Sequence, residues 1–300
     1  MPSRIAEQQP SQTALFTALR RALAHQEYRD NSFGPDRLAR CFLPSNMQFV
    51  LRFRRLRTYS KAKLAAAFPG MQEYVIARTA FFDRVFLHAL ESRTSQIVLL
   101  GAGYDSRAYR FAGQNHDSQI FELDAPATQD RKRKCLKAAR VAIPPWVNFV
   151  PIDFSRESLA ATLERAGYQV GDRTLFLWEG VSYYLDATSV DATLAFVRQS
   201  AEGSTIAFDY TITLTPENTD SYYGVREFAQ TMASHHADEQ LLFSVRDGHI
   251  GSFLESRGLR LLEHLSAEEI ESEYLVDGSG SLLGPIVGHF RFALASPMVR

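Results

Sequence analysis

Apolar positions recur every three or four residues through the first third of the chain, the spacing that predicts amphipathic helices. Residues 11–28, SQTALFTALRRALAHQEY, show this spacing behind Ser11 and Thr13, two candidate N-caps. Residues 70–92, GMQEYVIARTAFFDRVFLHALES, repeat it with larger apolar side chains. These patterns predict a helical N-terminal cap over residues 1–94.

After residue 95 the pattern changes to short apolar runs that alternate with amphipathic stretches. The runs read QIVLLGAG, QIFELDAP, WVNFVPIDF, TLFLWEGVSYY and STIAFDY, at residues 96–103, 119–126, 146–154, 174–184 and 204–210. Helical spacing returns between them, at residues 106–113, 128–140, 158–167 and 187–201. Strands that alternate with helices predict an α/β fold, a parallel sheet with helices on both faces.

The C-terminal part departs from this alternation. The polar and aromatic segment that begins at residue 211 is too long for a simple connection, so we predict an insertion at about 211–245 that acts as a lid. Its side chains suit a cover over an apolar or ring-bearing ligand, notably Tyr222, Tyr223, Arg226 and Phe228. The tail predicts one more helix–strand step at 253–265 and a closing strand at 288–297, which completes a core over residues 95–300.

Composition narrows the class of protein without changing this fold. The 300 residues are 45% hydrophobic and 22% charged, with a net charge of −1, as in an ordinary globular protein. This balance offers no general attraction to nucleic acid or to an anionic membrane. Cys41 and Cys135 match no metal spacing, and no apolar run has signal-peptide or membrane-spanning length. We expect a cytoplasmic monomer or homodimer that uses no metal.

Two glycines mark the first strand–helix turn of the predicted sheet. Gly101 and Gly103 end the run at 96–103, where glycine tolerates a positive φ and lets a ligand approach the backbone. Asp124 ends the next strand, 21 residues after Gly103, close to the spacing of an acid that binds ribose hydroxyls. The spacing predicts a nucleotide-like cofactor.

The residues after the glycines discriminate between cofactors. A dinucleotide fingerprint has a third glycine where this chain has Ser106, and the turn continues as Asp105-Ser106-Arg107. An acid beside a helix N-terminus would repel a pyrophosphate and would suit a cationic amine. S-adenosyl-L-methionine has a ribose, an amino group and a sulfonium but no phosphate. The chemistry therefore favours this methyl donor over NAD.

Acids end two further predicted strands. Asp153 and Phe154 end the third run, where an acid and a ring can hold the amine and the face of an adenine. Glu179 follows the apolar part of the fourth run. Ligands of open α/β sheets bind outside the carboxyl ends of the strands, so we expect Asp124, Asp153 and Glu179 to face one crevice. A cationic cofactor without phosphate accounts for this cluster better than a dinucleotide does.

Four blocks of the chain resemble the leucine carboxyl methyltransferase family in its broad sense. That family includes protein phosphatase methyltransferases and bacterial enzymes that methylate small natural-product acids. The blocks are YVIARTAFFD, IVLLGAGYDSRAYRF, FELDAP with the basic run after it, and LFLWEGVSYYL, which occur in the family's order within residues 70–210. The resemblance implies a Rossmann-like class I methyltransferase sheet, mostly parallel with an antiparallel last strand.

The resemblance also implies roles for site residues. Arg78 would pair with the carboxylate of S-adenosyl-L-methionine, because a planar guanidinium can bind a carboxylate through two nitrogens. A further basic contact from the N-terminal segment stays open among Arg37, Arg40, Lys61 and Lys63. The predicted cofactor set, which would release S-adenosyl-L-homocysteine, is Arg78, Gly101, Gly103, Asp105, Asp124, Asp153, Phe154 and Glu179.

The acceptor side is less defined. Methyl transfer from a sulfonium is an in-line displacement, for which an enzyme supplies mainly position, desolvation and electrostatics. A carboxylate acceptor is ionised at neutral pH and needs no general base. The candidate catalytic residues are therefore hydroxyls that can hydrogen-bond a carboxylate, those of Tyr183, Tyr184 and Tyr210. A hydroxyl acceptor would need a base, for which the candidates are His235, His236, His249 and His289.

Together these features predict an S-adenosyl-L-methionine-dependent O-methyltransferase of secondary metabolism that acts on a small-molecule carboxylic acid. The alternatives are a protein C-terminal carboxyl methyltransferase, an NAD-dependent oxidoreductase and a non-catalytic cofactor-binding protein. A closed aromatic pocket would favour the small molecule, and a wide polar crevice the protein. The basic run at 51–63, LRFRRLRTYSKAK, reads as a solvated helix face in preference to a nucleic-acid site.

Overall fold

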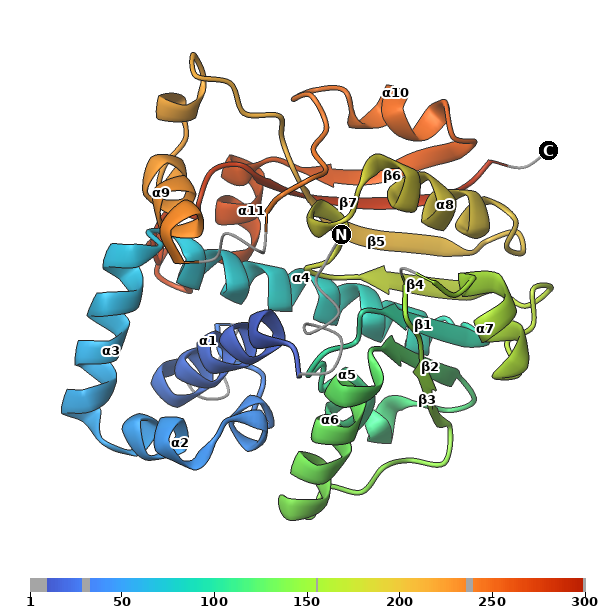
Figure 1. Cartoon of the computed structure of the whole chain (residues 1–300), viewed down its shortest axis with the longest axis horizontal. Helices are drawn as coiled ribbons and strands as arrows, with labels where there is room; N and C mark the ends of the chain where they lie inside the picture. The colour runs from blue at the N-terminus through green and yellow to red at the C-terminus, as the bar shows by residue number, and fades with distance from the viewer. Residues whose placement is uncertain (1–9, 29–32, 155, 236–239, 299–300) are drawn as a thin grey trace.

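The fold is that of a computed structural model, which describes residues 10–298 apart from 29–32, 155 and 236–239. A seven-stranded sheet runs through its centre in the order β3-β2-β1-β4-β5-β7-β6 (Figure 1). The strands are β1 (Gln96–Leu100), β2 (Gln119–Asp124), β3 (Val147–Pro151), β4 (Thr174–Trp178), β5 (Thr205–Thr211), β6 (Leu259–Leu265) and β7 (Phe290–Pro297).

The first five strands are parallel, and β7 runs antiparallel between β5 and β6. The predicted α/β fold with an antiparallel last strand is therefore confirmed. In β5 and β7 the register pairs Phe208 with Ala293 and Asp209 with Phe292. Because β1 lies between β2 and β4, the carboxyl ends of β1 to β4 come together at one edge of the sheet.

Alternate side chains of each strand point to opposite faces, and helices cover both. Ile97 and Leu99 of β1 join one apolar cluster, whereas Val98 and Leu100 join the other. The first cluster includes side chains of α1 (Gln12–Tyr28), α4 (Met71–Glu91), α5 (Arg107–Arg110), α6 (Pro126–Ala138) and α11 (Ala267–Tyr274). The second includes side chains of α7 (Leu159–Arg165), α8 (Ala187–Arg198) and α10 (Ile250–Glu255).

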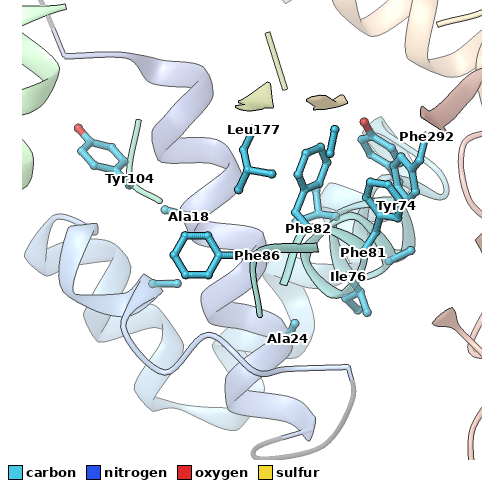
Figure 2. Close-up of a cluster of buried hydrophobic side chains, with 14 of the residues drawn as sticks. Ala18, Ala24, Tyr74, Ile76, Phe81, Phe82, Phe86, Tyr104, Leu177 and Phe292 are labelled. Carbon is cyan, nitrogen blue, oxygen red and sulfur yellow. The ribbon is translucent and has the colours of Figure 1, made fainter. Parts of the chain in front are cut away.

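Aromatic side chains fill the first cluster around α4 (Figure 2). Phe81 stacks on Phe292 of β7 with ring centroids 4.8 Å apart, and Phe82 meets Phe81 edge to face at 5.2 Å. Burial of one such ring contributes roughly 1.5–3 kcal/mol. The helix that precedes the first strand in the sequence is therefore part of the packed core against the sheet.

The remaining N-terminal helices lie further out. They are η2 (Ala39–Phe42), α2 (Ser45–Arg52) and α3 (Arg54–Ala67), and α3 has no buried residue. The basic run at 51–63 thus forms a mostly exposed surface, with Phe53 44% and Tyr59 61% exposed. None of the helices among the described residues combines the length and the apolar character needed to cross a bilayer.

One predicted strand ends earlier than the sequence pattern indicates, and the described part of the predicted insertion contains two helices. The fourth apolar run continues to Tyr184, but β4 stops at Trp178 and the chain turns at Gly180, where φ is 72°. Ser182–Tyr184 then form the short helix η4. In the insertion after β5, η5 (Thr219–Ser221) precedes α9 (Val225–His235), and Thr231 of α9 donates a hydrogen bond to the Ala67 carbonyl at 2.7 Å.

Candidate functional site

A cavity of about 1070 Å³ lies at the carboxyl ends of β1 to β4, and we call it the large cavity. Its walls include residues at the ends of four strands or within two residues after them, Gly101, Asp124, Asp153 and Glu179. The structure therefore brings the three strand-end acids into one crevice, as the alternation of strands and helices led us to expect. Phe154, Gly103 and Asp105 line it as well.

The glycine turn is fixed by close contacts. Gly101 has a φ of 73°, and a Cβ atom there would lie 2.6 Å from Cγ2 of Val181. A side chain at this position would therefore be strained in its backbone and would clash with the β4 loop. The backbone N–H of Gly103 donates to Asp124 Oδ2 at 2.6 Å, which ties the first turn to the end of β2.

Asp124 is held ready for further donors. Its Oδ1 accepts the N–H of Ala125 at 2.7 Å, so each oxygen already has one backbone partner. Burial raises the pKa of Asp124, and these two N–H groups oppose the rise. Thr128 also hydrogen-bonds the carboxylate, and since a carboxylate offers about four lone-pair sites, Asp124 can still accept from a ligand hydroxyl. A ribose presents such a hydroxyl.

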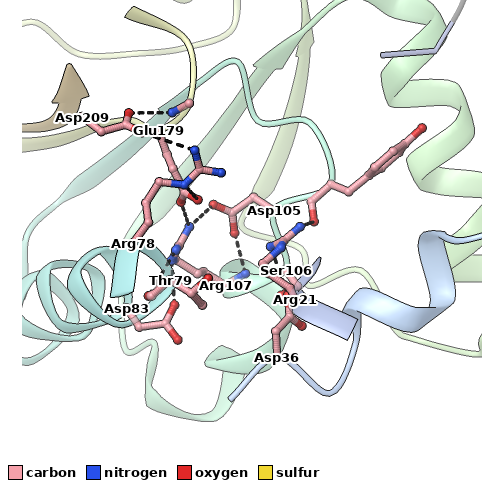
Figure 3. A network of polar contacts seen from close by, with 12 residues as sticks. Arg21, Asp36, Arg78, Thr79, Asp83, Asp105, Ser106, Arg107, Glu179 and Asp209 are labelled. Carbon is pink, nitrogen blue, oxygen red and sulfur yellow. Dashed lines mark hydrogen bonds and ion pairs between the residues drawn. The ribbon is translucent and has the colours of Figure 1, made fainter. Parts of the chain in front are cut away.

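Asp105 differs from its predicted role. Its Oδ1 accepts the Arg107 N–H at 2.7 Å, and its Oδ2 lies 2.5 Å from Arg107 Nη1 (Figure 3). Burial opposes ionisation of Asp105, but the charge of Arg107 lowers the pKa to about 2. Arg107, which Asp83 and Glu179 share, thus compensates part of the negative charge of Asp105. Asp105 alone is therefore a weaker argument against a pyrophosphate than the sequence indicated.

Ser106, which replaces the third glycine, belongs to a buried polar network. Its hydroxyl accepts a hydrogen bond from Arg110 Nε at 2.9 Å. Arg107 Nε and Arg110 Nη2 both lie against Asp83 Oδ1 of α4, at 2.8 and 2.6 Å. These buried ion pairs join the short helix α5 to α4. They were not predicted from the sequence.

Arg78 of α4 enters the large cavity between two acids. Its Nε lies 3.0 Å from Glu179 Oε1 and its Nη1 lies 3.3 Å from Asp209 Oδ2 (Figure 3). Its Nη2 has no hydrogen-bond partner among the described residues, so it can donate to a ligand carboxylate. A Cβ atom at Gly180 would come within 3.0 Å of Arg78 Nη1, so this glycine gives the guanidinium its place. Asp209, in the middle of β5, was not predicted.

Asp153 and Phe154 form the far wall of the large cavity. Asp153 Oδ2 pairs with Arg156 Nε at 3.3 Å, and Glu157 accepts the Asp153 N–H at 2.9 Å. The Phe154 ring is 41% exposed at the rim. An acid beside an exposed ring offers both a hydrogen-bond acceptor and a stacking surface.

Arg21 is a basic residue of the N-terminal segment that lies at the site, although the sequence did not single it out. It lines the large cavity from α1, with Nη1 3.0 Å from Asp36 Oδ2 and Nη2 donating to the Tyr104 carbonyl at 2.8 Å. The four candidates named from the sequence are all described, and none of them lines this cavity: Arg37, Arg40, Lys61 and Lys63. Lys61 instead pairs with Glu27, 2.8 Å away.

A second cavity of about 80 Å³ adjoins the first, and we call it the aromatic cavity. The two share wall residues at their junction, Thr13, Thr17, Arg78, Gly180 and Tyr184. The other walls of the aromatic cavity are mostly rings and thioethers, those of Phe16, Phe68, Met71, Tyr74, Tyr183, Phe228, Met232 and Phe290.

The three candidate tyrosines separate in the structure. Tyr183 and Tyr184 line the aromatic cavity, and Arg78 Nη1 donates to the Tyr183 hydroxyl at 3.3 Å. Tyr210 lines neither cavity. Its side chain belongs to the cluster on the other face of the sheet, and its hydroxyl lies 3.1 Å from His264 Nε2. The structure therefore does not bring Tyr210 to the site.

No histidine among the described side chains lines either cavity. His289 is buried behind Phe228 and Phe290, and burial lowers its pKa to about 3. His249 is exposed, with Nδ1 2.9 Å from the Asp247 carbonyl oxygen. His236 and the side chain of His235 fall outside the described residues.

Comparison with known proteins agrees with this geometry. The profile of the family described as leucine carboxyl methyltransferase matches residues 14–198. A Bacillus subtilis protein named "Putative S-adenosyl-L-methionine-dependent methyltransferase YktD" is 30% identical over 213 residues, which cover 69% of this chain and 67% of that protein. A Mycobacteroides abscessus protein of the same general name is 35% identical over 167 residues, covering 54% of this chain and 49% of its own length.

Solved structures support the fold alone. A crystal structure titled as a putative methyltransferase from Thermobifida fusca superposes with a TM-score of 0.59, covers 97% of this chain and 96% of its own, and is 14% identical. A Streptomyces avermitilis protein superposes with a TM-score of 0.58, 86% and 96% coverage and 13% identity. Both likenesses extend beyond the sheet to most of the chain.

Proposed function

This chain belongs to the leucine carboxyl methyltransferase family of S-adenosyl-L-methionine-dependent methyltransferases, and from that premise we propose that it methylates a carboxylate oxygen of a small molecule. The observation that carries the acceptor class is the aromatic cavity. It is small, it is walled by rings, and it meets the large cavity at Arg78 and Tyr184. A protein C-terminus would call for a wider and more polar entrance.

The residues of the large cavity suit the methyl donor. Arg78, with Nη2 available, would hold the donor carboxylate, and Glu179 would face its ammonium and sulfonium end beside Gly101 and Gly103. Asp124 would accept from the ribose hydroxyls. The rim pair Asp153 and Phe154 would hold the adenine amine and its face. When bound, S-adenosyl-L-methionine supplies an electrophilic methyl group on a sulfonium ion.

The chain's own contribution to the reaction is position and exclusion of water. In the displacement, the carbon–sulfur bond breaks as the carbon–oxygen bond forms, and the electron pair stays on sulfur. A carboxylate acceptor gives a neutral ester, and no proton is transferred. Tyr183 and Tyr184 would hydrogen-bond the acceptor carboxylate at the junction of the cavities, and Tyr183 is itself oriented by Arg78 at 3.3 Å. Such orientation accelerates a displacement by holding the two reacting atoms in line.

Two segments would close the site. The N-terminal cap supplies Thr13, Thr17 and Arg21 from α1, and the insertion at about 211–245 supplies Phe228 and Met232 from α9. Since both segments contribute walls to the aromatic cavity, we propose that they shield the methyl group from water once an acceptor is bound.

The test is a methylation assay with a labelled methyl group on the donor and a panel of small carboxylic acids. Transfer to a carboxylate gives a methyl ester, which base hydrolyses to volatile labelled methanol, whereas a methyl ether survives base. We expect volatile label from at least one acid of the panel. Base-stable product would move the acceptor to alcohols or phenols. Label found only on peptides with a free C-terminus would favour the protein methyltransferase alternative.

A further inference from the structure

Arg20 is a fully buried arginine whose guanidinium has no hydrogen-bond partner in the part of the chain that the structure describes. Its side chain lies in α1 at 0% exposure, and its Nε, Nη1 and Nη2 atoms have no hydrogen-bond partner among the described residues. The other buried arginines each have a carboxylate oxygen within 4.0 Å, namely Arg21, Arg78, Arg107, Arg110 and Arg291. Arg20 therefore stands apart from the ion-pair network of the large cavity.

The charge on Arg20 persists despite this burial. Burial lowers its pKa to about 10, and the charge of Glu73 opposes the lowering in part. Arg20 is therefore protonated at neutral pH. Burial also raises the pKa of Glu73, and no ion pair joins the two side chains in the described part of the chain. A buried charge is strongly unfavourable without a compensating partner, so this position calls for one.

Arg20 lies directly behind the wall of the aromatic cavity. Gln12, Phe16 and Arg20 follow one another at four-residue intervals along one stripe of α1, and the first two line the cavity. The Cζ atom of Arg20 is 4.4 Å from the centroid of the Phe16 ring and 6.0 Å from that of Phe68. A group stacked on the opposite face of Phe16 would lie roughly 8 Å from the guanidinium.

We propose that Arg20 makes the aromatic cavity selective for negatively charged acceptors, an inference that rests on the proposed function. The guanidinium attracts the carboxylate of a compact apolar acid across the Phe16 ring, while the aromatic walls hold the apolar body. At roughly 8 Å and an effective dielectric constant near 20, this attraction gives about a tenfold to thirtyfold preference for the anion. Arg20 is a specificity residue and makes no bond to the reacting atoms.

The test compares acids with their neutral amides in the presence of saturating S-adenosyl-L-homocysteine. The probes are acetate, 3-methylbutanoate, phenylacetate and 3-phenylpropanoate, each paired with its primary amide, and calorimetry gives each affinity. Wild type should bind at least one acid about tenfold more tightly than its amide. Arg20→Met should lose that preference, and Arg20→Lys should keep most of it. Arg84→Met changes a partly exposed arginine outside both cavities and should behave as wild type.

A structural role would give a different result. Arg20→Met removes an uncompensated charge, so it should unfold at the wild-type temperature or above. Lower stability with an unchanged acid preference would overturn the proposal, as would a wild type that binds no acid of the panel more tightly than its amide. If Arg20→Met does not fold, Glu73→Gln provides the test. Removal of this nearby negative charge should raise the preference for the acid over its amide. An unchanged preference in Glu73→Gln would contradict the proposal. Failure of wild type to bind S-adenosyl-L-homocysteine would instead contradict the proposed function.

Discussion

His289 shows how a single buried side chain ties stability to pH. It is fully buried against the rings of Phe228 and Phe290, and neither ring nitrogen has a partner among the described residues. Burial, with a smaller effect of Arg291, lowers its pKa to about 3, against about 6.5 for an exposed histidine. Below about pH 6.5 the unfolded chain therefore binds a proton that the folded chain does not bind until about pH 3.

The contribution of neutral His289 to the free energy of unfolding is fully present above about pH 6.5 and declines as the pH falls towards 3. We expect His289→Leu to flatten this decline, so that wild type loses about 2 kcal/mol more than the variant between pH 7.5 and pH 5. Urea unfolding at the two pH values measures the difference. His249→Leu, at an exposed histidine, is the control and should follow wild type. Equal losses in wild type and His289→Leu would show that the ring is already charged in the folded protein.

At the residue scale, the spacing of motifs predicted which residues lie at the site better than it predicted which side chains they contact. Gly101, Asp124 and Glu179 were predictable because strand ends of a parallel sheet converge at one edge. The pairing of Asp105 with Arg107 was not, since an acid followed two residues later by a base reads as a polar turn. One further feature of the sequence could have predicted a site residue, Asp209. Asp209 directly follows three apolar residues, 206–208, inside a buried strand. An acid in such a strand requires a partner, which here is Arg78.

At the scale of elements, a buried carboxylate joins α4 to α5. Asp83 accepts from Arg107 Nε at 2.8 Å, and from Arg110 Nη2 at 2.6 Å and Nη1 at 2.8 Å. Both arginines are buried, so loss of the carboxylate removes the partner that they share; Arg107 keeps Asp105 and Glu179, and Arg110 keeps only Asp36, 3.6 Å away, among the described residues. We expect Asp83→Ala to lower the free energy of unfolding by about 3–5 kcal/mol, measured by urea denaturation.

The matched control is Asp191→Ala on α8. Asp191 accepts from Arg257 Nε at 2.6 Å, but its side chain is 51% exposed. Solvent-exposed pairs contribute about 0–1 kcal/mol, so this variant should lie close to wild type. Equal effects of the two substitutions would mean that the Asp83 cluster carries no special share of the stability.

The periodicity of apolar residues predicted which segments form helices and strands, but it did not predict where each element ends. The apolar run of the fourth strand continues through Val181 and Tyr183, yet β4 stops at Trp178 because Gly180 turns the chain. Tyr183 lies in the short helix η4 and is buried beside the aromatic cavity. Because a buried turn also carries apolar side chains, its sequence resembles that of a strand. The predicted cap over 1–94 likewise included α4, whose apolar face packs against the sheet as part of the core.

At the scale of the whole molecule, the sheet order places two unlike cavities side by side. The large cavity collects acids at strand ends, while the aromatic cavity is built from α1, α4, α9 and β7, which are distant in the sequence. The residues of the large cavity were predictable from the sequence because they lie in short motifs. The aromatic cavity was not predictable, because no local pattern shows that Phe16, Phe228 and Phe290 line one cavity. The acceptor side that we propose therefore depends on long-range packing.

Binding of S-adenosyl-L-homocysteine is the measurement that tests the account most directly. At a concentration near 100 times the Kd, a ligand that binds only the folded chain adds about 2.7 kcal/mol of stability, which corresponds to a rise in Tm of about 5 °C for a protein of this size. We predict that rise with S-adenosyl-L-homocysteine, none with NAD, and a smaller rise in Asp124→Asn at the same ligand concentration. A rise with NAD and none with S-adenosyl-L-homocysteine would contradict the account.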